Sequence, residues 1–219
     1  MPRLLPVSLL AALLGAASAA SAAERLTEAA SGGSTSVPRG DRQAFAQPAA
    51  NLSAEEQLRF AVGNSFFRSP WVIAPASTAA RDGLGPLFNT NACINCHIRD
   101  GRGQLPNPQS PHAAGFLLRL SIPPELGDAA LRAHVGVIPE PVYGVQLQDR
   151  AIPGLRPEAR LMVDYEAHRV RFADGHEIEL RRPKPRLEEP AYGPLHPQLR
   201  TSLRIAPPMI GLGLLEAVP

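Results

Sequence analysis

The stretch Cys93-Ile94-Asn95-Cys96-His97 contains both cysteines of the chain, and the rest of the sequence is best interpreted from it. The pattern C-x-x-C-H is typical of covalent attachment of a c-type haem. On a helix of about 3.6 residues per turn, positions i, i+3 and i+4 share one face, so two thiols and one imidazole can reach a single ligand. Cys93 and Cys96 would form thioethers with the porphyrin, and His97 would bind the iron. The motif therefore predicts one covalent haem c.

Two other sites could use the same residues: a structural zinc site and a redox-active dithiol. A structural zinc ion takes about four cysteine or histidine ligands, and the chain has no second cysteine pair. A thioredoxin-type C-x-x-C follows a buried strand, whereas residues 87–91 read Leu-Phe-Asn-Thr-Asn and are too polar for one. Zinc binding and dithiol chemistry remain the alternatives to haem.

The N-terminus has the three parts of a secretory signal peptide, predicted over residues 1–23. Arg3 precedes an apolar run from Leu4 to Ala17, and small residues follow up to a cleavage site after Ala22 or Ala23. The run is short for a membrane span of about 20 residues, although an uncleaved anchor is the alternative. Because c-type haem is attached outside the bacterial cytoplasmic membrane, the motif and the signal peptide together predict a periplasmic protein.

Composition argues against two other classes of protein. The net charge of +2 and the scattered basic residues give no reason to expect nucleic-acid binding. Residues 203–218 are apolar but contain two prolines and two glycines, so no membrane span is expected there. Twenty-four prolines and 18 glycines predict many turns and loops, and a haem would supply apolar surface to a chain with 5% aromatic residues.

The chain divides at about residue 50. Residues 24–50 are small and polar and are expected to form a flexible N-terminal arm. Residues 51–219 are expected to form a single haem domain. A helix should begin at the capping box Ser53-Ala54-Glu55-Glu56 and end between residues 63 and 67.

The remaining elements predict an α+β fold. A short helix should start near Pro86 or Leu87 and end near Gly101 or Gly103. A short strand is expected within residues 115–122, and residues 161–180 have the alternation of a β-hairpin, with a turn at Asp174-Gly175. The sequence also contains a cluster of aromatic residues. Phe66, Phe67 and Trp71 are expected to pack in the core, or to cover a haem edge.

Several blocks of sequence resemble the bacterial di-haem oxidoreductases, also described as thiol oxidoreductases and related to di-haem cytochrome c peroxidases. Besides the motif, the resemblance rests on residues 62–67, 71–78, 81–89, 100–103, 143–148 and 204–216, and it covers roughly residues 30–219. It implies a cytochrome c-like helical core with β insertions, a periplasmic location and redox activity.

The chain departs from this family in having one C-x-x-C-H motif, whereas the family carries a second cytochrome domain with its own. It therefore resembles the N-terminal haem domain alone, from a truncated or split protein. Peroxidase activity in the family depends on electron flow between two haems. For this chain we expect a mono-haem electron carrier that works with another cytochrome or a second haem domain. The alternatives are a peroxidase-type enzyme with an open haem site and a haem-free fragment with a disulfide.

The sixth iron ligand would separate electron transfer from catalysis, because a Met or His there favours the former and an open site the latter. The candidates are Met162, Met209, His112, His134, His168, His176 and His196. Met209 ranks first, equal with no protein ligand, because the resemblance places its loop near the haem; His196 is second. Arginines flanking the motif could pair with the haem propionates, and these are Arg81, Arg99 and Arg102.

Overall fold

The structure is a computed structural model that describes residues 32–107, 114–216 and 218. The predicted signal peptide and the first residues of the predicted arm lie outside these residues. The chain divides into two units, Met1–Val62 and Gly63–Pro219, and the boundary falls within a helix. In the first unit, the described part of the arm contains two 3-10 helices, Gly33–Thr35 and Ala44–Ala46.

Helix α2 spans Ala54–Arg68 and begins at the predicted capping box. Both the Ser53 main-chain N–H and its hydroxyl donate to Glu56 Oε2 at 2.8 Å, and the Glu56 N–H donates back to Ser53 Oγ at 3.3 Å. These reciprocal bonds satisfy donors that a helix start leaves without partners, so the capping-box prediction is confirmed. The other described helices are short: α3 Cys93–Cys96, α4 Ala129–His134 and α5 Leu212–Glu216.

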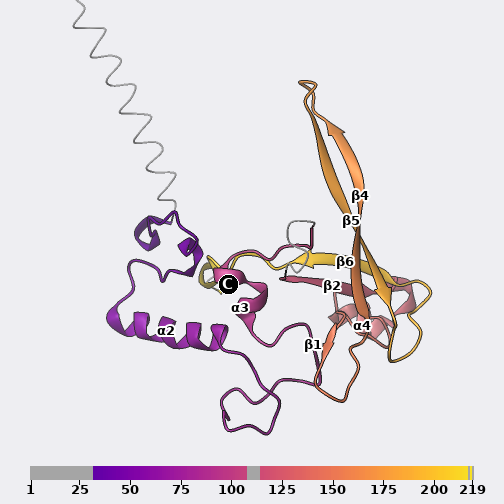
Figure 1. Ribbon diagram of the computed structural model, residues 1–219, viewed down its shortest axis with the longest axis horizontal. Coiled ribbons are helices and arrows are strands. Elements are labelled where there is room, and N and C mark those ends of the chain that lie inside the picture. The colour runs from indigo at the N-terminus through magenta and orange to yellow at the C-terminus, as the bar shows by residue number, and fades with distance from the viewer. Residues whose placement is uncertain (1–31, 108–113, 217, 219) are drawn as a thin grey trace, which may run out of the picture. The chain divides into compact units, whose positions relative to one another are not determined.

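Within the described residues, the strands form three antiparallel pairs (Figure 1). Strand β1, Leu87–Phe88, pairs with β3, Arg150–Ala151. Strand β2, Phe116–Ser121, pairs with β6, Arg200–Ile205, about 80 residues later in the chain. Strands β4, Arg160–Arg171, and β5, Glu177–Glu188, form the predicted hairpin. Helices and strands together confirm the α+β class, and no helix of the described part of the chain is long and apolar enough to cross a membrane.

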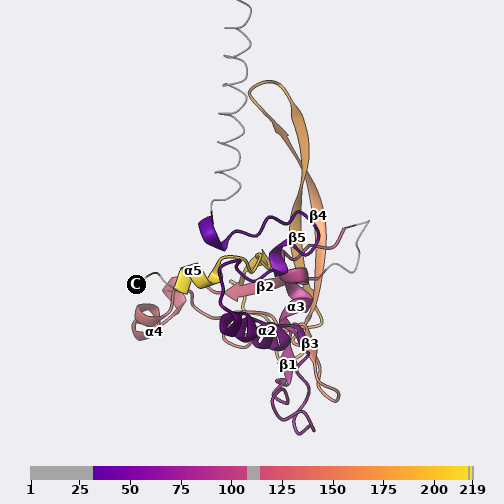
Figure 2. The same ribbon diagram turned by 90° about the vertical axis from the view of Figure 1, so that its left-hand side faces the viewer.

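The core lies on the buried face of the β2–β6 pair. Its fully buried side chains are Leu118, Leu120, Tyr143, Leu147 and Ala159. Partly buried leucines from the base of the hairpin and from the segment before β6 pack against them. Alternation places Leu118 and Leu120 on one face of β2, and the residues between them face the other way. The far half of the hairpin extends away from this core (Figures 1 and 2), and its strands are rich in exposed charges.

Two expectations from the sequence are wrong. Leu87 and Phe88 belong to β1 instead of a helix, because their backbones bond to Arg150 and Ala151; α3 is only four residues long. Only a 3-10 turn, Ile98–Asp100, follows the motif, and the positive φ values of Arg99 and Asp100, 55° and 60°, prevent the α-helix from continuing.

The aromatic cluster is the second correction. Phe66 is 49% exposed and Trp71 is 38% exposed, so neither packs in the core. Phe67 is half-buried, and its ring lies beside that of His97, with 6.1 Å between the centroids. Local apolar spacing could not show that the core would be built from leucines of β2, β6 and the hairpin base instead.

Candidate haem site

The motif is held at the end of a short loop that follows β1. Ala92, immediately before the first cysteine, is buried. The Asn95 amide donates to the Thr90 hydroxyl at 3.1 Å and to the Asn91 side chain at 3.2 Å, and the His97 N–H donates to the Cys93 carbonyl at 3.0 Å. These bonds fix one helical turn, which places the two cysteines and the histidine on the same side of a cavity.

Two glycines allow the segments on either side of residues 104–114 to approach each other and the motif closely. A Cβ on Gly103 would lie 1.9 Å from the Gly115 carbonyl oxygen, and one on Gly115 would lie 2.2 Å from the Cys96 oxygen. Gly115 also has a φ of 87°, which favours glycine. Ala206 bonds to both glycines, donating to the Gly115 carbonyl at 2.8 Å and accepting from the Gly103 N–H at 2.9 Å. Residues that follow β6 are thereby held against the motif.

The imidazole of His97 makes a defined hydrogen bond with this segment. Its Nδ1 lies 2.8 Å from the carbonyl oxygen of Pro207. A carbonyl can only accept, so Nδ1 carries the proton and Nε2 is the nitrogen with a free lone pair. Histidines that bind metals almost always donate their other ring N–H in this way, which fixes the tautomer and the ring orientation. His97 is therefore prepared to bind a metal through Nε2.

A cavity of about 990 Å³ lies between the motif, β1 and the β2–β6 pair. Ligand sites range from about 300 to 1,000 Å³, so this one is large. Much of its lining is apolar and comes from Leu87, Phe88, Phe116, Leu117, Leu120, Val137, Val145, Ile205 and Pro207. Cys93, Cys96 and His97 line it as well. A flat apolar macrocycle joined to two thiols and one imidazole fits this combination of residues.

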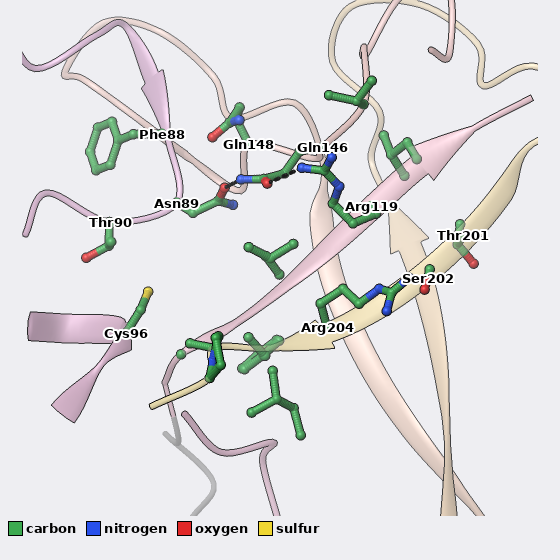
Figure 3. A pocket seen from close by; sticks show the side chains of 18 of the residues that line it. Phe88, Asn89, Thr90, Cys96, Arg119, Gln146, Gln148, Thr201, Ser202 and Arg204 are labelled. Carbon is green, nitrogen blue, oxygen red and sulfur yellow. Dashed lines mark hydrogen bonds between the residues drawn. The ribbon is translucent and has the colours of Figure 1, made fainter. Parts of the chain in front are cut away.

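One wall of the cavity is polar, and hydrogen bonds link its side chains to one another (Figure 3). Arg119 Nη1 donates to the side-chain oxygen of Gln146 at 3.2 Å, and the Gln146 amide donates to Asn89 Oδ1 at 2.6 Å. The Asn89 amide in turn donates to the Leu147 carbonyl at 2.7 Å and to Asp149 Oδ1 at 2.9 Å. These hydrogen bonds connect Asn89, just before the motif, to the segment around Gln146, which runs antiparallel to β2 along its edge.

No disulfide joins the two cysteines. Cys93 is exposed, whereas Cys96 is half-buried, and Figure 3 shows it across the cavity from Arg119 and Gln146. Burial raises the pKa of the Cys96 thiol, and the negative charge of Asp149 raises it further. A neutral thiol suits a cavity with a largely apolar lining.

The cationic residues at the cavity differ from those expected. Arg81, Arg99 and Arg102 flank the motif in sequence but do not line the cavity, whereas Arg119, Arg200 and Arg204 do. The sequence did carry a signal for two of them. Arg200, Ser202 and Arg204 alternate with less polar residues, which is the pattern of a strand with one polar face.

The candidate sixth ligands are dispersed. Met209 does not line the cavity; its main-chain N–H donates to the Asp100 carbonyl at 2.7 Å. The His196 ring accepts from the Gln198 N–H at 3.1 Å, away from the cavity lining. Three more belong to the hairpin, Met162, His168 and His176, while His134 ends α4 and His112 lies outside the described residues. Among the described residues, His97 is the only histidine or methionine that lines the cavity.

Comparison with known proteins identifies the family of the chain. No curated protein and no solved structure is significantly similar to the chain. Residues 26–219 match the family described as "Di-haem oxidoreductase, putative peroxidase". The match covers most of the chain, including the motif, β1 to β6 and the C-terminal segment that bonds to His97, and it confirms the resemblance seen in the sequence. The chain belongs to the di-haem oxidoreductase family.

Proposed function

We propose that this chain is an exported c-type haem protein that accepts and passes on single electrons. In this proposal, Cys93 and Cys96 hold one haem through thioethers, and His97 Nε2 binds its iron. The observation that carries the proposal is the bond from His97 Nδ1 to the Pro207 carbonyl, in the same cavity as both thiols. When bound, the haem would supply a one-electron iron couple. Family membership supports haem as the cofactor.

The chain's own residues would tune that couple. The Pro207 carbonyl fixes the His97 ring and increases the basicity of Nε2, which favours the oxidised iron. Apolar side chains such as Phe88 and Leu120 would exclude water from part of the cavity and disfavour the extra positive charge of that oxidised state. The domain would thus be cytochrome c-like in how it attaches haem, while its core is built on the β2–β6 pair.

A second candidate is a peroxidase-type enzyme with an open iron site. It is favoured by one observation: among the described residues, no histidine or methionine besides His97 lines the cavity. An open coordination position allows peroxide or oxygen chemistry. In that case electrons would come from a redox partner, either another cytochrome or a second haem domain. The signal peptide proposed for residues 1–23 would place either protein in the periplasm.

Pyridine haemochrome analysis of the exported protein tests both candidates. We expect about one c-type haem per chain. If there is none, the haem-free fragment with a Cys93–Cys96 disulfide becomes the better account. With haem present, a low-spin spectrum that cyanide does not change would support electron transfer. A high-spin spectrum that cyanide converts would support the enzyme.

A further inference from the structure

The cavity has an uneven distribution of charge. Three arginines line it, Arg119, Arg200 and Arg204, and no aspartate or glutamate of the described residues does. None of the three arginines forms an ion pair within the described part of the chain, although most other ion pairs in the structure involve arginine. A ligand of this cavity would therefore meet positive charge that the protein itself does not neutralise.

Strand register places these arginines together. In the β2–β6 pair, Arg119 lies opposite Ser202, so Arg200 and Arg204 are its two diagonal neighbours. Alternation puts all three on the same face, and diagonal neighbours are about 7–8 Å apart at their Cα atoms. Like charges at this spacing repel one another. A bound anion would offset that repulsion.

One of the arginines is already oriented. Arg119 donates through Nη1 to the Gln146 side chain, which is itself held by Asn89. A guanidinium has five N–H donors, and four of those on Arg119 are not used by this bond. Arginine is well suited to carboxylates because its planar fork can form two parallel hydrogen bonds with them. Figure 3 shows Arg119 and Arg204 on the neighbouring strands, across the cavity from Cys96.

All three arginines are also exposed, so they lie on the solvent-accessible side of an otherwise largely apolar cavity. The ligand that suits this arrangement is a mostly apolar molecule with carboxylates at one edge, because those charged groups can remain hydrated there. We propose that Arg119, Arg200 and Arg204 bind the propionate carboxylates of the haem. The inference rests on the proposed function. It assigns the propionates to arginines of β2 and β6 instead of the arginines beside the motif.

The three arginines Arg119, Arg200 and Arg204, together called the arginine cradle, would change the electrostatic potential at the haem. Guanidinium groups beside the propionates offset their negative charge, which otherwise stabilises the oxidised iron. Neutralising the arginines should therefore lower the midpoint potential. It should also move the pH dependence of that potential to higher pH, since a carboxylate without a cationic partner holds its proton more tightly.

The test uses the exported full chain with haem attached, as Arg119→Gln and as the double variant Arg200→Gln/Arg204→Gln. Arg102→Gln is the matched control, because Arg102 is an exposed arginine beside the motif that does not line the cavity. We expect equal haem content in all proteins, with a lower midpoint potential only in the cavity variants. Lysine at the same positions keeps the charge and should restore most of the midpoint. If the glutamine variants fold poorly, the lysine variants still test the assignment. They should move the pH dependence of the midpoint potential in the same direction, but by less than loss of the positive charge would.

Several results would overturn the assignment. Cavity variants that match both wild type and Arg102→Gln in potential and pH dependence would remove it while leaving the proposed function intact. A second experiment titrates the proteins with succinate as a free dicarboxylate. A saturable spectral change that is lost in the cavity variants, without any change in midpoint, would assign the cradle to an external carboxylate instead. Absence of haem from the wild-type chain would overturn the proposed function and the cradle together.

Discussion

His97 Nδ1 lies 2.8 Å from the carbonyl oxygen of Pro207, which is 110 residues further along the chain. This bond joins the haem-attachment motif to the segment after β6. That segment is also tied to the residues after the motif, through Ala206 to Gly103 and through Met209 to the Asp100 carbonyl. The orientation of the proposed iron ligand thus depends on a contact between two segments that are far apart in the sequence of the second unit, Gly63–Pro219.

The first prediction concerns this junction. Gly103→Ala should destabilise the protein by about 3 kcal/mol, because the new methyl group would overlap the Gly115 backbone. Gly63→Ala is the matched control. It lies in α2 with no atom within 4 Å of the added Cβ, so it should stabilise by at most about 1 kcal/mol. Urea unfolding of both variants measures the difference, and equal stability of the two would show that the close approach is wrong.

The second prediction concerns the hydrogen bonds between side-chain amides on the cavity wall. Asn89→Ala and Gln146→Ala each break the bond between these two side chains. Their effects on the free energy of unfolding should be non-additive by about 1 kcal/mol in a double-mutant cycle. Asn64→Ala is the control partner, since Asn64 lies in α2 and, among the described residues, the side chain of Gln146 bonds to Arg119 and Asn89 instead. Additive effects of Asn89→Ala and Gln146→Ala would show that these two side chains do not interact.

The third prediction concerns the sixth ligand. Met209→Leu keeps nearly the same side-chain volume and retains the main-chain bond to Asp100, so the protein should fold normally. Because Met209 does not line the cavity, the visible spectrum of the haem protein should not change. Conversion from a low-spin to a high-spin spectrum would instead identify Met209 as an iron ligand.

The fourth prediction concerns a buried carboxyl beside the core. Burial raises the pKa of Glu158 above its ordinary value of 4.5, and the charge of Glu140 raises it further, while a hydrogen bond from the Gln148 N–H opposes the rise. The folded protein therefore binds this proton more tightly than the unfolded chain does. The associated stability is fully present below the ordinary carboxyl pKa and is lost as pH rises through the higher folded pKa.

Glu158→Gln removes this titration and keeps an oxygen that can accept from the Gln148 N–H, now 2.6 Å from Glu158 Oε2. Unfolding should be followed at several pH values from below 4.5 to neutrality. Relative to the variant, the wild-type protein should lose stability as pH rises. A difference that is constant with pH would show that folding does not shift the pKa of Glu158, and a change in the opposite direction would show that folding lowers it.

Elements with local signals could be predicted from the sequence. The capping box at Ser53 and Glu56 specifies the start of α2, and the alternation around Asp174-Gly175 specifies the β4–β5 hairpin. The three motif residues do meet at one cavity, because their spacing within one turn is itself local. The class α+β follows from these same patterns.

What could not be predicted depends on pairing between distant segments. The ladder of β2 with β6 brings Arg204 opposite Leu117, and no local pattern contains that information. The same pairing carries Pro207 to His97 and separates Met209 from the cavity lining. Nearness in sequence therefore suggested arginines beside the motif, whereas the fold supplies those of β2 and β6.

The most direct test of the central claim is the mass of one tryptic peptide. Cleavage after Arg81 and Arg99 releases residues 82–99, which contain Cys93, Cys96 and His97. In protein exported by a bacterium that attaches c-type haem, this peptide should carry the mass of one haem, and Cys93→Ala/Cys96→Ala should abolish the addition. Recovery of the wild-type peptide with two free thiols or an internal disulfide, from cells whose other cytochromes c are matured, would contradict the account.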